Sequence, residues 1–320
     1  MPKPERKRAA SAVAAERDRR DPPKARGDLA KLRGSIPPLV TPFKNGEVDW
    51  KKLDELIDFH VEAGTDVLVP CGTTGEAATM TEDEQKRVVA ITLEEAGKVP
   101  VLAGAGSNDT RTAVERSKAM AALGAHGILS VGPYYNKPTP EGFFRHFATI
   151  ADAVSVPIVV YNVPGRTGSN IDTKTQLRLA GHPNITAVKE ASGNLTQVMD
   201  LLRDRPDGFE ILSGDDANAI TFMALGGEGV ISVAANQVPG PMHDLIAACA
   251  RGDFKEGRRI HYRLLHLMNL NFVESNPIPV KAGLALMGLC EESFRLPMCP
   301  PKEGTREALR AALKELELLP

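Results

Sequence analysis

The 320-residue sequence predicts an α/β protein folded as a (β/α)8 TIM barrel, followed by a small C-terminal helical appendage. Eight short apolar runs rich in β-branched residues recur roughly every 20–35 residues, and a pattern typical of an amphipathic helix follows most of them. Nearly continuous apolar runs are typical of strands buried on both faces, and alternating strands and helices imply parallel pairing. Eight such units favour a closed barrel. No G-x-G-x-x-G motif opens a helix after the first run, which weakens a nucleotide-binding open sheet.

The predicted strands account for residues 35–238, which we expect to form the barrel. In chain order they are residues 36–40, 66–70, 99–103, 127–130, 156–160, 185–189, 209–212 and 229–233.

Helix signals occupy the intervals between these runs. Asp49 can cap a helix that ends near Gly64, and Asn108 or Asp109 can begin another that ends near Gly124. Thr81 and Glu84 have the spacing of a capping box, and Thr139 precedes a proline at a favoured first-turn position. Beyond residue 238 the strand pattern stops. Residues 239–320 are predicted to form the appendage, with helices at 242–251, 254–271, 279–289 and 306–318.

The first 34 residues differ in composition from the rest of the chain. They contain eleven Lys or Arg and five Asp or Glu, a net charge of +6, whereas the remainder carries −8, giving −2 in total. Few large apolar side chains are present to offset the entropy of ordering, so we expect residues 1–34 to be a disordered basic arm. The arm has no apolar core typical of a secretory signal. A solvated tail is favoured over nucleic-acid binding.

The overall composition indicates a soluble globular protein in which 42% of residues are hydrophobic and 25% are charged. No apolar run approaches the roughly 18 residues that a membrane span needs. The four cysteines show no metal-binding spacing, and no histidine pair has that of a zinc site. We therefore expect reduced thiols, no metal and a cytoplasmic location.

Polar residues cluster where the predicted strands end, which is where barrel enzymes place their active sites. Three of the four tyrosines of the chain lie there. These segments are residues 71–76, 132–136, 161–168, 189–194 and 213–216.

Lys189 is the candidate nucleophile because it ends a buried strand directly after Val188. Burial disfavours the charged ammonium, and a neutral amine can attack a ketone carbonyl to form a Schiff base. Alternatively, Lys189 points outward or pairs with Glu190 or Glu76, although strand alternation sends Lys189 and Glu190 to opposite faces. Lys281 is a rival nucleophile, but it lies in a predicted helix, where a packing role is favoured.

Schiff-base chemistry also needs a proton shuttle. Tyr161, at the end of the neighbouring strand, is the candidate. A tyrosine of high pKa is a poor base, and Thr73 and Tyr135 can supply a hydroxyl relay that lowers the cost of moving its proton. A core tyrosine with a satisfied hydroxyl is the alternative.

Two further segments suit carboxylates. The turn at residues 72–75 offers the hydroxyls of Thr73 and Thr74 beside approachable backbone N–H groups, although it can also be a plain tight turn. Arg166 can bind a second carboxylate through its planar fork, or it can be an exposed loop arginine.

Six motifs in order resemble the dihydrodipicolinate synthase branch of the pyruvate-dependent class I aldolase family, from about Gly34 to the C-terminus. They are residues 72–76, 133–136, 161–168, 189–195, 212–216 and 276–281.

The resemblance implies roles for eight residues in joining pyruvate to L-aspartate 4-semialdehyde without a cofactor, in lysine and diaminopimelate biosynthesis. Lys189 forms the imine. Thr73, Tyr161 and Tyr135 form the relay, with Tyr135 entering from a neighbouring subunit of a homodimer or homotetramer. Thr73 and Thr74 hold the pyruvate carboxylate, and Arg166 receives that of the semialdehyde. Gly214 and the backbone of Ile231 line the pocket.

The sequence leaves two other functions open and departs from the family at one place. A related lyase for sialic acid or a 2-keto-3-deoxy sugar acid shares the lysine and tyrosine, and a barrel that binds without turnover is a further alternative. Family members inhibited by lysine often carry histidines and a glutamate at the allosteric site. The aligned positions here are Ala77, Glu82, Gln85 and Thr112, although Asn108 and Tyr134 match. We therefore expect weak or absent inhibition by lysine.

Overall fold

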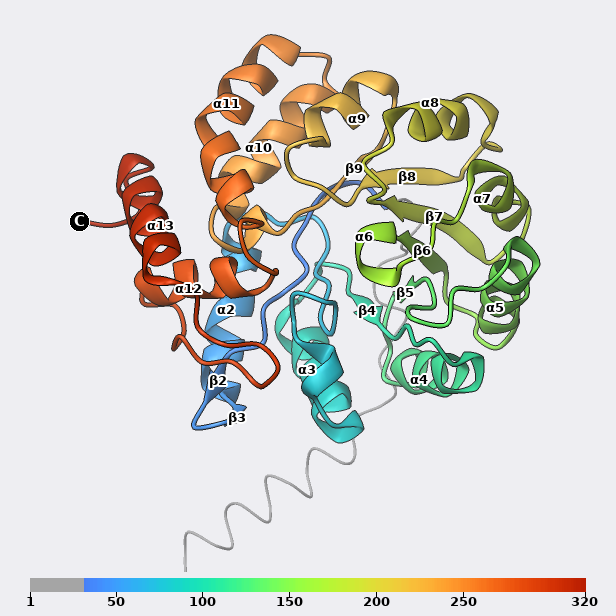
Figure 1. Cartoon of the computed structure of the whole chain (residues 1–320), viewed down its shortest axis with the longest axis horizontal. Coiled ribbons are helices and arrows are strands. Elements are labelled where there is room, and N and C mark those ends of the chain that lie inside the picture. Colours follow the sequence, from blue (N-terminus) through green and yellow to red (C-terminus); the bar gives the residue numbers. More distant parts are fainter. Residues whose placement is uncertain (1–31) are drawn as a thin grey trace, which may run out of the picture.

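Seven parallel strands form the centre of the molecule in the computed structural model, which describes residues 32–320 (Figure 1). Their order in the sheet is β1-β9-β8-β7-β6-β5-β4, and β1 pairs with β9, so the first and last strands of the chain are neighbours. A closed barrel requires this pairing. The strands are β1 (Gly34–Ile36), β4 (Leu102–Gly104), β5 (Gly127–Val131), β6 (Ile158–Asn162), β7 (Ile185–Glu190), β8 (Glu210–Ser213) and β9 (Gly229–Ile231).

The second expected strand, residues 66–70, closes the gap between β1 and β4 without forming a regular ladder. It makes single parallel bridges on both sides, Pro38 to Val69 and Leu68 to Val101. The expected eighth position in the barrel is therefore filled, but the assignment of a full strand was wrong. Prolines in the three adjoining segments, which cannot donate to a ladder, explain the interruption: Pro37, Pro38, Pro70 and Pro100.

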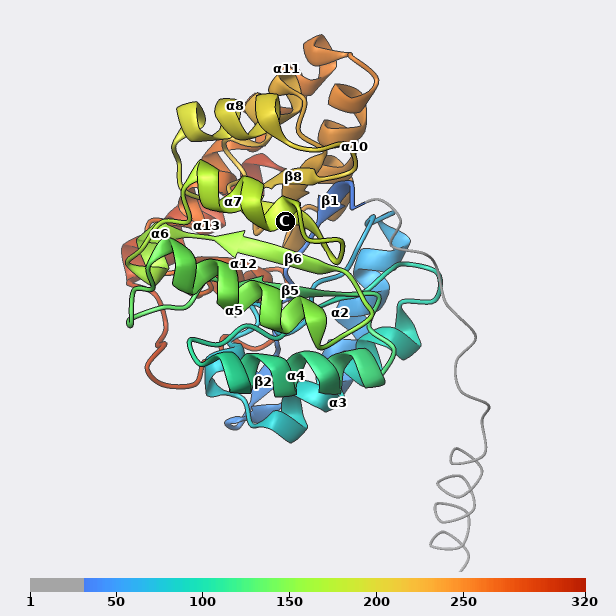
Figure 2. The same cartoon turned by 90° about the vertical axis from the view of Figure 1, so that its right-hand side faces the viewer.

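Helices surround the sheet, as Figures 1 and 2 show. The sequence signals at their starts are confirmed: Asp49, Asp109 and Thr139 accept hydrogen bonds as N-caps, and Thr81 forms its capping box with Glu84. The helices are α2 (Trp50–Glu62), α3 (Glu82–Glu95), α4 (Thr110–Ala122), α5 (Pro140–Asp152), α7 (Thr173–Ala180), α8 (Leu195–Asp204), α9 (Ala219–Leu225) and α10 (Pro239–Ala250). A short helix, α6 (Pro164–Thr167), lies in the loop after β6, and β2 (Phe43–Lys44) pairs with β3 (Glu47–Val48) beside the barrel.

Two layers of buried side chains show which way each strand residue points. Val159, Tyr161 and Ala187 belong to the cluster inside the barrel, whereas Val160 and Val188 pack in the layer between the strands and the helices. Since side chains alternate along a strand, Lys189 shares the inward direction of Ala187. The alternation of β6 and β7 thus directs both Tyr161 and Lys189 into the barrel.

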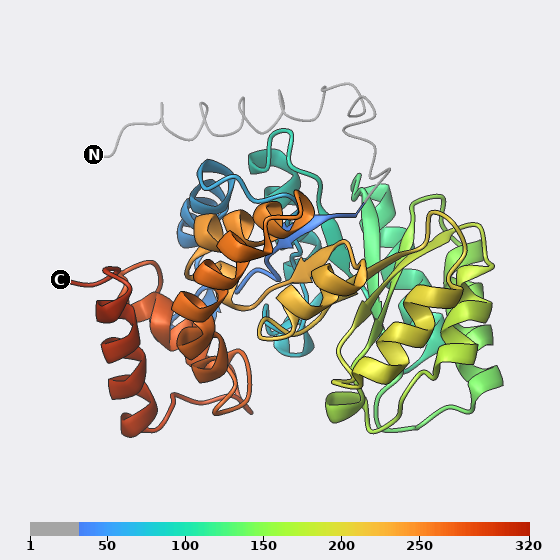
Figure 3. The same ribbon diagram turned by 90° about the horizontal axis from the view of Figure 1, so that it is seen from above.

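The C-terminal helices form a lobe at one edge of the barrel, seen in Figures 1 and 3. They are α11 (Phe254–Leu270), α12 (Ile278–Leu286) and α13 (Glu303–Glu315). Helix α10 instead packs against both β1 and α9 and so occupies the eighth place in the helix ring. We therefore propose a barrel boundary after α10 in place of the expected one after residue 238.

The beginning of the described chain also belongs to the barrel. Leu32 is buried and its backbone N–H donates to the carboxylate of Glu210, and β1 starts at Gly34, before the expected boundary at residue 35. Most of the expected basic arm lies outside the described residues. Within residues 32–320, no helix combines the length and apolar character needed to cross a bilayer.

Candidate active site

A cavity of about 380 Å³ opens where the barrel strands end, and it gathers most of the candidate site residues. Its walls come from the ends of the barrel strands, from the segments that follow them and from the C-terminal lobe. Six of the eight candidates line it: Thr73, Thr74, Tyr161, Arg166, Lys189 and Gly214.

Lys189 and Tyr161 lie side by side in this cavity. They are register partners on the paired strands β7 and β6, and the Lys189 Nζ lies 4.1 Å from the centroid of the Tyr161 ring. Lys189 is 5% exposed and Tyr161 is 7% exposed. Parallel pairing of two inward-pointing residues therefore places an amine against a phenol at the floor of the cavity.

Burial sets the protonation of both groups. It lowers the pKa of Lys189 from 10.5 to about 7, an effect that the buried Asp216 carboxylate opposes and the Arg166 guanidinium increases. Burial also raises the pKa of Tyr161 to about 12. A substantial fraction of Lys189 is therefore a neutral amine near pH 7, whereas Tyr161 keeps its proton and can give it up only within a relay.

This shifted pKa predicts the pH dependence of the reaction of Lys189 with a ketone. Since only the neutral amine attacks, the rate of imine formation should rise about tenfold per pH unit below pH 7 and level off above it. Mass spectrometry of adducts reduced by cyanoborohydride, at subsaturating pyruvate, measures this rate. A rate that keeps rising past pH 9, as an unperturbed lysine requires, would contradict the assignment.

The strand end that carries Lys189 is fixed from its opposite face by Glu190. The buried Glu190 carboxylate accepts hydrogen bonds from the side-chain amides of Asn162 (2.9 Å), Gln176 (2.7 Å) and Gln197 (3.2 Å), and from the backbone N–H of Ser192 (2.7 Å). Neutral donors from β6, α7 and α8 thus satisfy this carboxylate. The expected separation of Lys189 and Glu190 to opposite faces is confirmed.

The turn at residues 72–75 presents the two candidate threonines differently. Thr73 is exposed to the cavity, whereas Thr74 is buried and its Oγ1 accepts a hydrogen bond from Asn276 Nδ2 at 2.9 Å. The backbone N–H of Glu76 donates to the carbonyl of Thr73 at 3.1 Å, which closes the turn. Burial raises the pKa of the adjacent Cys71 thiol to about 12, so this cysteine is not a thiolate nucleophile at neutral pH.

Arg166 lies at the mouth of the cavity, in helix α6. Its Nη2 donates to the backbone oxygen of Asn276 at 3.2 Å, and its side chain is otherwise exposed. Asn276 therefore contacts both Arg166 and Thr74, although it precedes the α12 helix of the C-terminal lobe. No role was predicted for Asn276, whose only signal in the sequence is membership of the motif at residues 276–281.

Gly214 leaves space for the Lys189 side chain. A Cβ at Gly214 would lie 2.6 Å from the Cβ of Ala191 and 3.1 Å from the Cε of Lys189. Such contacts are too close for any residue with a side chain. Only glycine lets the β8 loop approach Lys189 this closely.

Two candidates, Tyr135 and Ile231, do not line the cavity of the single chain. Ile231 is buried on β9, where it pairs with Ile36. Tyr135 is 89% exposed, and its backbone has a φ of 74°, in the left-handed region that most residues avoid. Its side chain is thus presented to the outside of the subunit.

The rival lysine has a different environment. Lys281 is fully buried, and its Nζ lies 2.5 Å from the Glu76 carboxylate and 4.1 Å from the centroid of the Phe43 ring. Lys281 does not line the cavity. The alternative that Glu76 neutralises Lys189 was therefore wrong, because Glu76 pairs with Lys281.

No group of three or more His, Cys, Asp or Glu suited to a metal ion occurs between residues 32 and 320. The candidate groups that line the cavity are an amine, a phenol, two hydroxyls and a guanidinium. Together they can form an imine, move protons and bind carboxylates.

Comparison with known proteins points to one family. The family model described as the dihydrodipicolinate synthetase family matches residues 31–316. The 4-hydroxy-tetrahydrodipicolinate synthase of Chlorobium phaeobacteroides is 53% identical over 291 residues, which covers 90% of this chain and 97% of that protein.

Two solved structures of dihydrodipicolinate synthases are also similar to this chain. The dihydrodipicolinate synthase of Aquifex aeolicus superposes with a TM-score of 0.88 at 44% identity, covering 90% of this chain and 99% of that one. A variant described as the first monomeric dihydrodipicolinate synthase superposes with a TM-score of 0.89 at 43% identity, covering 90% and 98%.

Proposed function

Since this chain belongs to the dihydrodipicolinate synthetase family, we propose that it condenses pyruvate with L-aspartate 4-semialdehyde through an imine on Lys189. The activity is that of a 4-hydroxy-tetrahydrodipicolinate synthase, a lyase of lysine and diaminopimelate biosynthesis. The observation that carries the assignment of Lys189 is its place in the cavity, buried against Tyr161 and with a pKa near 7.

The reaction begins with attack of the neutral Lys189 amine on the ketone carbon of pyruvate. The carbinolamine loses one water to give the imine, and loss of a methyl proton gives the enamine. The enamine carbon attacks the aldehyde of the second substrate and forms the new carbon–carbon bond. The amino group of that substrate then displaces Lys189 by transimination, which closes the ring and restores the free lysine.

Each of these steps moves a proton, and Tyr161 is the residue to which we assign this role. Because burial holds the pKa of Tyr161 near 12, a free tyrosinate would be costly, so the proton must pass along hydroxyls. Thr73 offers one hydroxyl in the same cavity. The exposed Tyr135 suits a role in the cavity of a partner subunit, where its hydroxyl would extend the relay.

The outward direction of Tyr135 supports a homo-oligomer of at least two subunits, in which each site borrows this residue. A tetramer of two such dimers is the larger assembly that we propose.

Two sets of donors recognise the carboxylates. The hydroxyls of Thr73 and Thr74 and the turn that carries them would hold the pyruvate carboxylate near Lys189. Arg166, held at the cavity mouth by Asn276, would take the carboxylate of the semialdehyde by its planar fork. Gly214 and the Ile231 backbone would shape the wall around the imine.

The choice of aldehyde is the part of this proposal that needs a direct test. We expect pyruvate-dependent consumption of L-aspartate 4-semialdehyde, and no comparable cleavage of N-acetylneuraminate or of a 2-keto-3-deoxy sugar acid. We expect this preference because the planar, charged guanidinium of Arg166 binds a carboxylate better than it binds a row of sugar hydroxyls. Cleavage of a sugar acid at a similar kcat/KM would favour the lyase alternative instead.

L-lysine is not expected to inhibit the enzyme at millimolar concentration. At the position where inhibited relatives often carry a glutamate, this chain has Thr112, a hydroxyl in place of a carboxylate, and that hydroxyl donates to Asp109 at 2.7 Å. The buried Gln85 amide donates to the Ala77 carbonyl at 2.8 Å. Steady-state assays with and without L-lysine measure this. Clear inhibition at low millimolar L-lysine would contradict the expectation.

A further inference from the structure

The buried ion pair between Glu76 and Lys281 has no part in the mechanism above, yet it adjoins the turn that is proposed to bind pyruvate. Glu76 follows Thr73, Thr74 and Gly75 directly, and its backbone has a φ of 52° and a ψ of 36°. Lys281 belongs to α12 of the C-terminal lobe, which is 205 residues further along the chain. The pair therefore joins the end of the turn to a distant part of the fold.

Both members of the pair are removed from water. Their side chains are 0% and 2% exposed, and their nearest charged atoms are 2.5 Å apart. Burial lowers the pKa of Lys281, and the neighbouring Glu76 carboxylate opposes that shift. Desolvating two charges costs about as much as their attraction returns, so a buried pair is weak evidence for stability alone. A role in fixing geometry is the better explanation.

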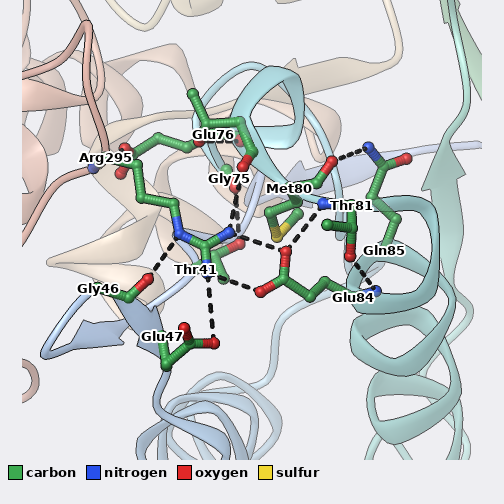
Figure 4. A network of polar contacts seen from close by, with 11 residues as sticks. Thr41, Gly46, Glu47, Gly75, Glu76, Met80, Thr81, Glu84, Gln85 and Arg295 are labelled. Atoms are coloured by element: carbon green, nitrogen blue, oxygen red, sulfur yellow. Dashed lines mark hydrogen bonds and ion pairs between the residues drawn. The ribbon is translucent and has the colours of Figure 1, made fainter.

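Arg295 strengthens the same connection, as Figure 4 shows. Its backbone N–H donates to the second Glu76 carboxylate oxygen at 3.3 Å. Its guanidinium donates two hydrogen bonds, of 2.6 and 2.8 Å, to the Glu84 carboxylate. The guanidinium also donates to the carbonyls of Thr79 (3.1 Å) and Gly46 (2.8 Å). Both oxygens of the Glu76 carboxylate are therefore held by the C-terminal lobe, and so is the segment that follows it.

We propose that Glu76 and Lys281 are positioning residues for pyruvate binding: their buried pair holds the Thr73–Thr74 turn at the place of the pyruvate carboxylate. This inference rests on the proposed function, since it assigns the turn to pyruvate. Its consequence is that the C-terminal lobe contributes to the active site without touching the reacting atoms.

The test uses the full chain with both charges removed together, as Glu76→Gln with Lys281→Met. Removing one charge alone would leave the other buried without a partner and destabilise the fold. The double variant is expected to fold, to raise the KM for pyruvate by at least about tenfold, and to change kcat at saturating pyruvate far less. At saturating pyruvate, borohydride should still trap an imine on Lys189.

The matched control is the ion pair between Arg306 and Glu292 at 2.6 Å, which lies in the same lobe but makes no contact with the turn. Arg306→Met with Glu292→Gln should leave the KM for pyruvate unchanged. Thermal unfolding of each variant separates an effect on binding from a loss of folded protein.

The outcomes are distinguishable. A folded double variant with a wild-type KM for pyruvate would overturn the inference and leave the proposed function standing. A wild-type enzyme that forms no imine with pyruvate would overturn both. If the double variant does not fold, Glu76→Asp keeps both charges but shortens the reach by one methylene. A folded Glu76→Asp enzyme with an unchanged KM would also overturn the inference, whereas a raised KM supports it.

Discussion

Replacing Lys189 with methionine is expected to lower kcat by about 10⁴-fold or more, the scale seen when the nucleophile of a covalent mechanism is removed. Methionine keeps most of the buried stem that packs against Tyr161 but cannot form an imine. The fold should tolerate the change, because it removes a buried amine whose charge is already disfavoured. Steady-state turnover of pyruvate with L-aspartate 4-semialdehyde gives the measurement.

The control for this prediction is the double variant Glu76→Gln with Lys281→Met, which makes the same substitution at buried Lys281 without leaving the Glu76 charge unpaired. This variant should still form the pyruvate imine at saturating pyruvate. If Lys189→Met kept a kcat within tenfold of wild type, or if only the double variant lost the imine, the nucleophile would have been assigned to the wrong residue.

Replacing Tyr161 with phenylalanine is expected to lower kcat by about 10²–10³-fold, within the range for removing a positioned acid–base group. The ring remains to pack beside the Lys189 Nζ, so only the proton-carrying hydroxyl is lost. The KM for pyruvate should change much less than kcat, because the carboxylate donors stay in place. Rates of imine formation and of overall turnover, measured on the same variant, separate these effects.

Tyr262→Phe is the matched control for Tyr161→Phe. Tyr262 lies on α11 and is 68% exposed, so loss of its hydroxyl should leave kcat unchanged. An unchanged kcat in Tyr161→Phe would remove this residue from the proton relay and return it to the alternative of a core tyrosine.

Much of the barrel could be predicted from the sequence because local signals and burial agree there. The strands at residues 127–130, 185–189 and 209–212 are continuous apolar runs, and their observed ends differ from the expected ones by at most one residue. Residues 66–70 behaved differently. The run has the pattern of a strand, but prolines on both sides leave it with single bridges, an effect that depends on which segments become neighbours.

The boundary between the barrel and the C-terminal lobe depends on tertiary packing in a similar way. No sequence feature indicates that α10 belongs to the barrel and α11 to the lobe, and only the packing of α10 against β1 and α9 assigns it to the ring. The pattern of a helix shows that it has an apolar face. It does not show which partner covers that face.

The gathering of Lys189, Tyr161, Thr73, Thr74 and Arg166 in one cavity could be anticipated, since the carboxyl ends of barrel strands meet at one face. The contacts that hold this site could not. Asn276, Lys281 and Arg295 reach it from a lobe about 200 residues away in sequence, and no local periodicity links them to Glu76 or Thr74. Their side chains are placed by tertiary packing alone.

The measurement that tests the central claim most directly is reduction of the wild-type protein with sodium borohydride in the presence of pyruvate, followed by peptide mapping by mass spectrometry. We predict a single reduced pyruvate adduct on Lys189. An adduct on Lys281, or no adduct under conditions where the protein is folded, would contradict the proposed imine mechanism.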